Sequence, residues 1–409
     1  MFDFNNYNYD FKNNQLKVNG EPMLVHCHHY NTFLQRSIMD AEYIDSKPFL
    51  VGAAAEVAYN QLKPMLSNIA SPEERKKAAS ELFRLSGFGL LPLDNINEKG
   101  GSVSTPCSHY SYAWKEKFGK SETPVSYFSA GFLAGAYAAI YDLELKNVQA
   151  EQTACLSVGA EKDQYTVSEG KANFSIFEPK ADFTYNETTG YSEIETNVDR
   201  DGITKAVAGL PLLGNESGLI PVFGVYLTRM YADYYNRISF EFEKEMIKIA
   251  GDDGIAVSSS LFVEAGHVCA FNTFGGIMNS PEWDGLILPS LKNKEDWVSA
   301  MTSCVNSLGW GSWKVMEASE KGAVFRVVND YESIGYKRMY GKAEHGISYL
   351  VTGAAAGILD LIYLGDVASK PNFTPEFYEK LFKGPDAYKF ELTKCQAQGS
   401  EYTEVVLSR

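Results

Sequence analysis

The sequence contains one segment twice, because residues 86–142 recur as residues 308–364 at a constant offset of 222 positions. The matching residues are mostly glycines, which chance rarely aligns at one offset. They pair Gly87 with Gly309, Gly89 with Gly311, Glu98 with Glu320, Lys99 with Lys321, Gly100 with Gly322, Gly131 with Gly353, and Gly135 with Gly357. Each copy of a repeat is expected to be a folding unit. The sequence therefore predicts two tandem homologous units related by a pseudo-twofold axis, an arrangement that also allows a homo-oligomer.

The composition fits two packed units of ordinary domain size. The chain has 409 residues, of which 45% are hydrophobic, including 25 Tyr and 24 Phe. That is enough for two cores and for apolar pockets. A polar stretch without periodicity, residues 178–202, separates the two copies. We expect an N-terminal unit over residues 1–180, a linker over residues 181–202 and a C-terminal unit over residues 203–409.

Charge and cysteine usage limit the partners and the compartment. The net charge is -15 and no Lys/Arg cluster is present, so neither nucleic acid nor an anionic lipid surface is an expected partner. The first residues lack the pattern of a signal peptide, and the apolar runs 128–141 and 349–364 are too short to span a bilayer. Six cysteines without a CxxC pattern favour free thiols. The chain is predicted to be cytoplasmic, without membrane insertion.

Hydrophobic periodicity and turn residues predict the same order of elements in both copies. Ser71 and Glu74 have capping-box spacing at the start of one helix. In the first copy we expect helices over 28–45, 50–66, 72–85 and 124–143, a hairpin over 90–108, and strands over 148–158 and 164–167. In the second copy we expect helices over 222–250, 258–277, 294–308 and 346–364, a hairpin over 311–330, and strands over 388–396 and 402–408. Each unit is thus predicted to be α+β, with helices packed on an antiparallel sheet.

A strand-borne signature occurs once in each copy: Glu151-x3-Cys155-x3-Gly159 and Glu391-x3-Cys395-x3-Gly399. With the order of elements, it resembles the 4-vinyl reductase domain family, which shares its fold with nitric-oxide sensors and subunits of the TRAPP transport complex. The resemblance implies a domain that binds small hydrophobic molecules. A second Cys, common in the family four residues after the motif glycine, is replaced here by Asp163 and Thr403.

The richest cluster of chemically reactive side chains is the stretch from Val25 to Asn31, which holds three of the six His residues. Its expected counterpart, residues 218–226, has neither His nor Cys. Imidazole and thiolate are good ligands for iron, zinc or copper. Cys107 and His109 repeat the C-x-H pattern in the same copy and are also lost in the other. We therefore consider an iron or zinc site whose candidate ligands are His26, Cys27, His29, Cys107 and His109.

Two other interpretations of this cluster remain open. Adjacent His residues at a helix start are often caps, and a buried Cys often acts as a small hydrophobe. Alternatively, Cys27 near a helix N-terminus and imidazoles has the features of a nucleophile, which makes it the candidate catalytic residue. Around a hydrophobic ligand, the candidate binding residues are His28, Tyr30, Tyr110, Glu151 and Cys155.

The leading functional hypothesis is the binding of a small hydrophobic or aromatic molecule in the N-terminal unit, with the His/Cys cluster as its polar or metal-bearing end. One alternative is a metal-dependent oxidoreductase or lyase that uses the same cluster. Another is a scaffold subunit of an assembly. The sequence has no P-loop, G-x-S-x-G or HExxH motif, so nucleotide chemistry and serine hydrolysis are disfavoured. Whether the chain is an enzyme stays open at this point.

Overall fold

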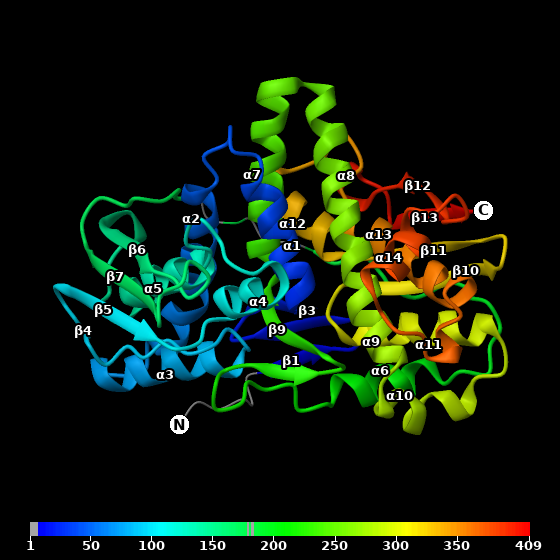
Figure 1. The fold of residues 1–409 in the computed structure, drawn as a ribbon, viewed down its shortest axis with the longest axis horizontal. Coiled ribbons are helices and arrows are strands. Elements are labelled where there is room, and N and C mark those ends of the chain that lie inside the picture. The colour runs from blue at the N-terminus through cyan, green and yellow to red at the C-terminus, as the bar shows by residue number, and fades with distance from the viewer. Residues whose placement is uncertain (1–6, 178–179, 181–183) are drawn as a thin grey trace.

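A five-stranded antiparallel sheet at the centre of the molecule joins the N-terminal segment to a segment from the middle of the sequence. The computed structural model describes residues 7–177, 180 and 184–409; the first three residues of the expected linker, 181–183, lie outside this range. The sheet has the order β1-β2-β3-β9-β8. Its strands are β1 (Tyr7–Asp10), β2 (Gln15–Val18), β3 (Glu21–Cys27), β8 (Ile220–Val222) and β9 (Val225–Tyr231). Strand β3 pairs with β9, from Met23 opposite Tyr231 to Cys27 opposite Leu227. Figure 1 shows this sheet between two lateral α+β units.

Two four-stranded antiparallel sheets, one on each side, share one strand order. The first sheet has the order β4-β5-β7-β6 and the second β10-β11-β13-β12. The strands are β4 (Ile96–Asn97), β5 (Gly100–Thr105), β6 (Val148–Ala154), β7 (Asp163–Glu169), β10 (Ser312–Ser319), β11 (Gly322–Val328), β12 (Lys389–Lys394) and β13 (Thr403–Ser408). An irregularity interrupts the register at Gln152/Ala154 in the first sheet and at Leu392/Lys394 in the second. The predicted α+β class is confirmed, whereas the predicted unit boundaries remain a prediction.

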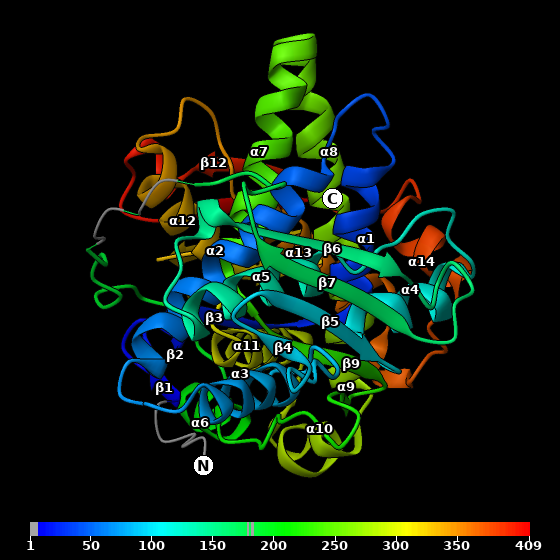
Figure 2. The ribbon, with the colours of Figure 1, turned by 90° about the vertical axis from the view of Figure 1, so that its left-hand side faces the viewer.

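Pairs of small-residue helices cover each lateral sheet. In the first unit α2 (Lys47–Leu66) packs on α5 (Tyr127–Ile140), and in the second α8 (Asp252–Cys269) packs on α13 (Tyr349–Leu359). Figure 2 shows β6, β7, β5 and β4 with α2 and α5 behind them. A Cβ on Gly131 would lie 2.2 Å from the Val51 carbonyl oxygen, and a Cβ on Gly353 would lie 2.2 Å from that of Val263. The repeated glycines therefore let two helix backbones approach closely.

The remaining helices include some that the sequence predicts and others that it does not. They are α1 (His28–Met39), α3 (Pro72–Leu85), α4 (His109–Phe118), α6 (Arg200–Ala208), α7 (Ala232–Ala250), α9 (Gly275–Met278), α10 (Pro281–Leu286), α11 (Lys294–Ser307), α12 (Tyr331–Tyr340) and α14 (Pro375–Phe382). The sequence does not predict α4, α6, α10 and α12. Helix α3 has the predicted bounds, and the Ser71 side chain accepts the Glu74 N–H at its start. The prediction of helix over 222–231 is wrong, since this stretch forms β8, a turn and β9.

A buried ion-pair network connects the first lateral unit to the centre of the molecule. Lys180 Nζ lies 2.6 Å from Asp233 and 3.7 Å from Glu56, and Arg237 lies 3.4 Å from Glu56, so a buried ion-pair network links α2 to α7.

Helices α7 and α8 project together beyond the rest of the molecule (top of Figure 1). The segment Asp252–Met278 is long and apolar enough to cross a membrane, but 61% of its most apolar window is buried in protein, as in a core helix.

Gly353→Ala tests the close approach of α8 and α13. The added methyl group has no room beside the Val263 carbonyl, so we expect a loss of about 1–3 kcal/mol of unfolding free energy, measured by urea denaturation. Gly285→Ala is the control, because a Cβ there meets no atom within 4 Å. Equal denaturation midpoints for the two variants would contradict this packing.

Candidate functional site

The His/Cys cluster lies where strand β3 ends and helix α1 begins. His26 and Cys27 close the strand, and Cys27 is also the N-cap of α1, without a side-chain capping hydrogen bond. Both side chains are fully buried. His28 and His29 form the first turn of the helix, as predicted for its start. The pairing of β3 with β9 places this junction inside the molecule rather than at its surface.

His26 is enclosed by aromatic rings from both halves of the chain. Its ring stacks on Tyr30 at 4.1 Å and on Trp310 at 4.4 Å between centroids, and it meets Tyr235 edge-on at 5.1 Å. His26 Nδ1 lies 3.4 Å from Cys269 Sγ. His26 Nε2 has no hydrogen-bond partner among the described residues. Burial holds the pKa of His26 well below its usual range, so the imidazole is neutral at physiological pH.

Cys27 forms a buried pair with Cys269, from the last residue of α8. Burial raises the pKa of the Cys27 thiol, but hydrogen bonds from Cys269 and Thr273 oppose this effect and leave that pKa below its usual value. The pKa of Cys269 is raised by burial and by its contact with Cys27. All six cysteines are free thiols in the structure. We call His26, Cys27, Tyr30, Tyr235, Cys269 and Trp310 the central cluster.

The other imidazoles of the predicted site neighbour the central cluster, but each has a different environment. His28 Nδ1 accepts the Tyr226 N–H at 3.0 Å, and the rings of His28 and His29 lie 3.9 Å apart. Asn31 donates its side-chain amide to His109 Nε2 at 2.9 Å. Burial lowers the pKa of His28 to about 4, of His29 to about 2 and of His109 to about 3. All three are therefore neutral at pH 7.

Three predicted site residues lie apart from the central cluster. Cys107 follows strand β5, where burial and the nearby Asp163 raise its pKa to about 11. Glu151 forms an ion pair at 2.9 Å with Lys47, and both side chains are about half exposed. Cys155 belongs to a separate apolar cluster with Trp114 and Val125. In the part of the chain that the structure describes, no three His, Cys, Asp or Glu side chains are placed to hold a metal ion. The iron or zinc site therefore remains a prediction.

Cys155 adjoins a buried carboxylate network that the sequence reasoning missed. Asp163 accepts hydrogen bonds from Ser108, Ser111 and Gln152 at 2.7, 2.8 and 3.1 Å. In the other unit the carboxylate is Asp330, which accepts from Thr403 at 2.6 Å. The repeat aligns Ser108 with Asp330. Each unit therefore pairs one acidic side chain with one hydroxyl, but the acidic residue is the partner of Ser108 in the first unit and the aligned residue itself in the second. The exchange of Ser108 for Asp330 between the two copies was the sequence signal for this network.

The structure corrects the counterpart of the His/Cys stretch. The Val25 N–H donates to the Leu308 carbonyl, and the Arg229 N–H donates to the Ser86 carbonyl, both at 2.9 Å. Since the repeat aligns Ser86 with Leu308, Val25 and Arg229 are equivalent. The counterpart of residues 25–31 is therefore residues 229–235, not 218–226, because the predicted helix over 222–250 left no place for strand β9. This stretch also lacks His and Cys.

A hollow in the N-terminal unit lies away from these residues. It encloses about 1000 Å³ between α3 and the connection to β4, and its wall includes Lys76, Glu81, Arg84 and Asp94. None of the predicted site residues lines it. Apolar side chains, among them Met65, Leu90 and Leu91, complete the wall, so this hollow has a mixed polar and apolar character.

Comparisons with known proteins do not assign a family to this chain. No family model matches, and no curated protein is similar. Among solved structures, the phenol-responsive sensory domain of the transcription activator PoxR, solved with phenol, matches 38% of this chain and 80% of its own length, with 14% identity and a TM-score of 0.33. The resemblance to the 4-vinyl reductase domain family therefore stays a prediction.

Burial of the thiols predicts their reactivity. Ellman's reagent should label fewer than one thiol per native chain within minutes, and all six after denaturation, because every Cys is buried. Tyr43→Cys provides the control, because Tyr43 is 65% exposed and the variant should add one fast-reacting thiol. A fast native thiol that Cys27→Ala removes would contradict the buried position and favour Cys27 as a nucleophile.

Proposed function

We propose that this protein binds a small aromatic molecule with a polar substituent at the central cluster. The observation that carries the proposal is the fully buried, neutral His26 ring, which is stacked on two aromatic rings and has no partner for Nε2. Buried polar atoms in folded proteins are nearly always hydrogen-bonded, to protein, water or ligand. A substituent such as a hydroxyl group would satisfy this nitrogen.

Further groups near His26 favour the same chemistry. The hydroxyls of Tyr110 and Tyr234 interact with each other, and neither has another hydrogen-bond partner among the described residues. Tyr235, which contacts His26 edge-on, lies 6.0 Å from the Tyr234 ring between centroids. Aromatic surface with a few convergent polar groups is typical of small-molecule sites.

The electrostatics of the central cluster favour a neutral ligand. His26 is neutral, and removing a charged molecule from water into this interior would cost several kcal/mol without a partner of opposite charge. Aromatic walls favour a planar ring, which gains offset or edge contacts with Tyr30, Tyr235 and Trp310. The ligand class is therefore an uncharged hydroxylated aromatic molecule.

The position between the units suggests how a ligand enters. Tyr30 comes from α1 and Trp310 from the connection between α11 and β10, so the two walls belong to different halves of the chain. Trp310 is held by a hydrogen bond from Nε1 to the Val25 carbonyl at 3.0 Å. Side-chain rearrangement at this seam would make room for the ligand. The metalloenzyme and scaffold alternatives find no specific observation in their favour.

Calorimetric titration with 1-naphthol and naphthalene tests the proposal, since the two probes differ by one hydroxyl group. We expect 1-naphthol to bind, with His26→Phe weakening it by about tenfold, the value of one hydrogen bond, while naphthalene changes less. Trp114→Phe is the control, because Trp114 lies in a separate apolar cluster. The proposal fails if 1-naphthol does not bind, or if the His26→Phe variant binds 1-naphthol with unchanged affinity.

A further inference from the structure

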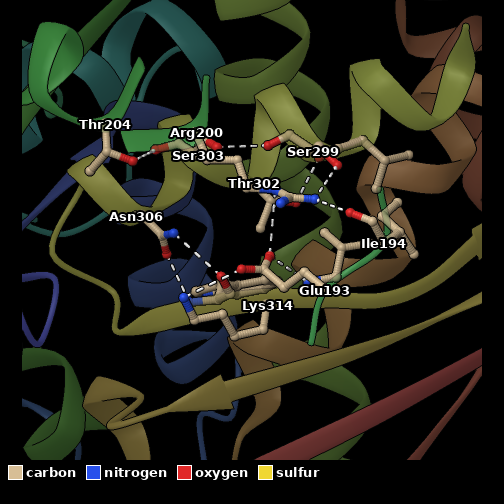
Figure 3. Close-up of polar contacts among 12 residues, drawn as sticks. Glu193, Ile194, Arg200, Thr204, Ser299, Thr302, Ser303, Asn306 and Lys314 are labelled. Atoms are coloured by element: carbon tan, nitrogen blue, oxygen red, sulfur yellow. Dashed lines mark hydrogen bonds and ion pairs between the residues drawn. The ribbon is translucent and has the colours of Figure 1, made fainter. Parts of the chain in front are cut away.

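A second cavity, on the side of the C-terminal unit, has the opposite chemistry to the central cluster. It encloses about 670 Å³ between the segment 188–199, helices α6 and α11, and strand β10. No member of the central cluster lines it. Figure 3 shows polar side chains converging there from these elements.

Helix α11 supplies a buried polar stripe to this cavity. Ser299, Thr302, Ser303 and Asn306 lie at helical spacing and all line the wall. Thr302 donates its hydroxyl to the Val298 carbonyl at 2.7 Å, and Ser303 donates to the Ser299 carbonyl at 2.8 Å. Since each hydroxyl has used its one proton on the helix, its free lone pairs accept hydrogen bonds. The stripe is thus prepared for a ligand that carries donors.

Four cations and three carboxylates line the cavity: Lys12, Arg200, Lys205 and Lys314 against Glu193, Asp199 and Asp201. Glu193 lies between two of the cations, 3.6 Å from Arg200 Nε and 3.4 Å from Lys314 Nζ. Asp199 is used as the cap of α6, where it accepts the Gly202 N–H at 2.9 Å. Lys205 also lines the wall and forms no ion pair with any described residue. The lining thus has one more positive than negative charge, so in a chain of net charge -15 an anion is favoured here over the rest of the surface.

Trp313 adds a donor that lacks an acceptor. The residue lines the cavity and is 1% exposed, and its Nε1 has no hydrogen-bond partner among the described residues. An indole N–H can only donate. It therefore calls for an oxygen atom that the described part of the protein does not provide.

We propose that this cavity binds a small polyhydroxylated anion, either a sugar acid or a sugar phosphate. The anionic group would meet Arg200, Lys314 and Lys205, while hydroxyl groups of the ligand donate to the α11 stripe and accept from Trp313. This site is independent of the proposed function at the central cluster.

Titration of the full chain with gluconate, glucose 6-phosphate, glucose and inorganic phosphate tests the proposal. We expect gluconate or glucose 6-phosphate to bind below about 1 mM, and at least about tenfold more tightly than glucose or inorganic phosphate. Whichever anion binds more tightly identifies the source of the charge, and either supports the site. No saturation by either anion, or an equal affinity for glucose or for inorganic phosphate, overturns the proposal.

Two variants localise the binding. Lys314→Met and Lys205→Met should each weaken the bound anion by about fivefold or more, while Lys47→Met, a surface ion-pair residue of the other unit, should not. Lys205→Met keeps the test valid if Lys314→Met disturbs folding, because Lys205 pairs with no described residue. Anion binding that neither substitution changes overturns the proposal. Binding of 1-naphthol serves as the independent check that the central cluster is intact.

Discussion

The pairing of β3 with β9 is the constraint on which the rest of the structure depends. This pairing places a strand near the N-terminus directly beside a strand that begins at Val225. Because the pair is antiparallel, the helices that follow the two strands, α1 and α7, start at opposite ends of the pair. His26 and Cys27 then come to lie against Trp310 and Cys269 of the other half. Neither half alone could enclose this histidine.

The consequence for His26 follows from elementary electrostatics. A histidine in water titrates near neutrality, but one sealed between Tyr30 and Trp310 loses the hydration of its charged form and stays neutral. It can then offer one donor and one acceptor without a charge. The second cavity differs because it contains charged groups: two cations share the Glu193 carboxylate, and hydroxyl groups line the wall. We therefore propose different ligands for the two sites, an uncharged aromatic molecule at the central cluster and a polar anion at the second cavity.

Local signals in the sequence predicted much of the fold. The repeated glycines marked the close helix pairs, since Gly131 and Gly353 face carbonyl groups of α2 and α8. Ser71 fixed the start of α3 through its cap. By contrast, the stretch 222–231 was predicted as helix because its strand character depends on pairing with β3, a contact about 200 residues away in sequence. Strands β1 to β3 were also missed, although β1 pairs with β2 and β2 with β3 over short sequence distances.

The candidate site was predicted less completely than the fold. The His/Cys stretch was identified from its composition, and the structure confirms that α1 starts there. The sequence could not show that Cys107 and Cys155 lie away from the central cluster, or that Cys269 and Trp310 belong to it, because these contacts depend on tertiary packing. The exchange of Ser108 and Asp330 was visible in the aligned repeat, and its meaning became clear only when Asp163 and Thr403 were seen as their partners.

The most direct test of the central claim is nitrogen-15 NMR of the histidine side chains, with and without 1-naphthol. The account predicts that His26, assigned with His26→Phe, stays neutral from pH 5 to 8, since its pKa is held well below its usual range, and that its Nε2 resonance shifts when 1-naphthol binds. A His26 that titrates near pH 6.5, or an Nε2 resonance that does not move while 1-naphthol binds, would contradict it.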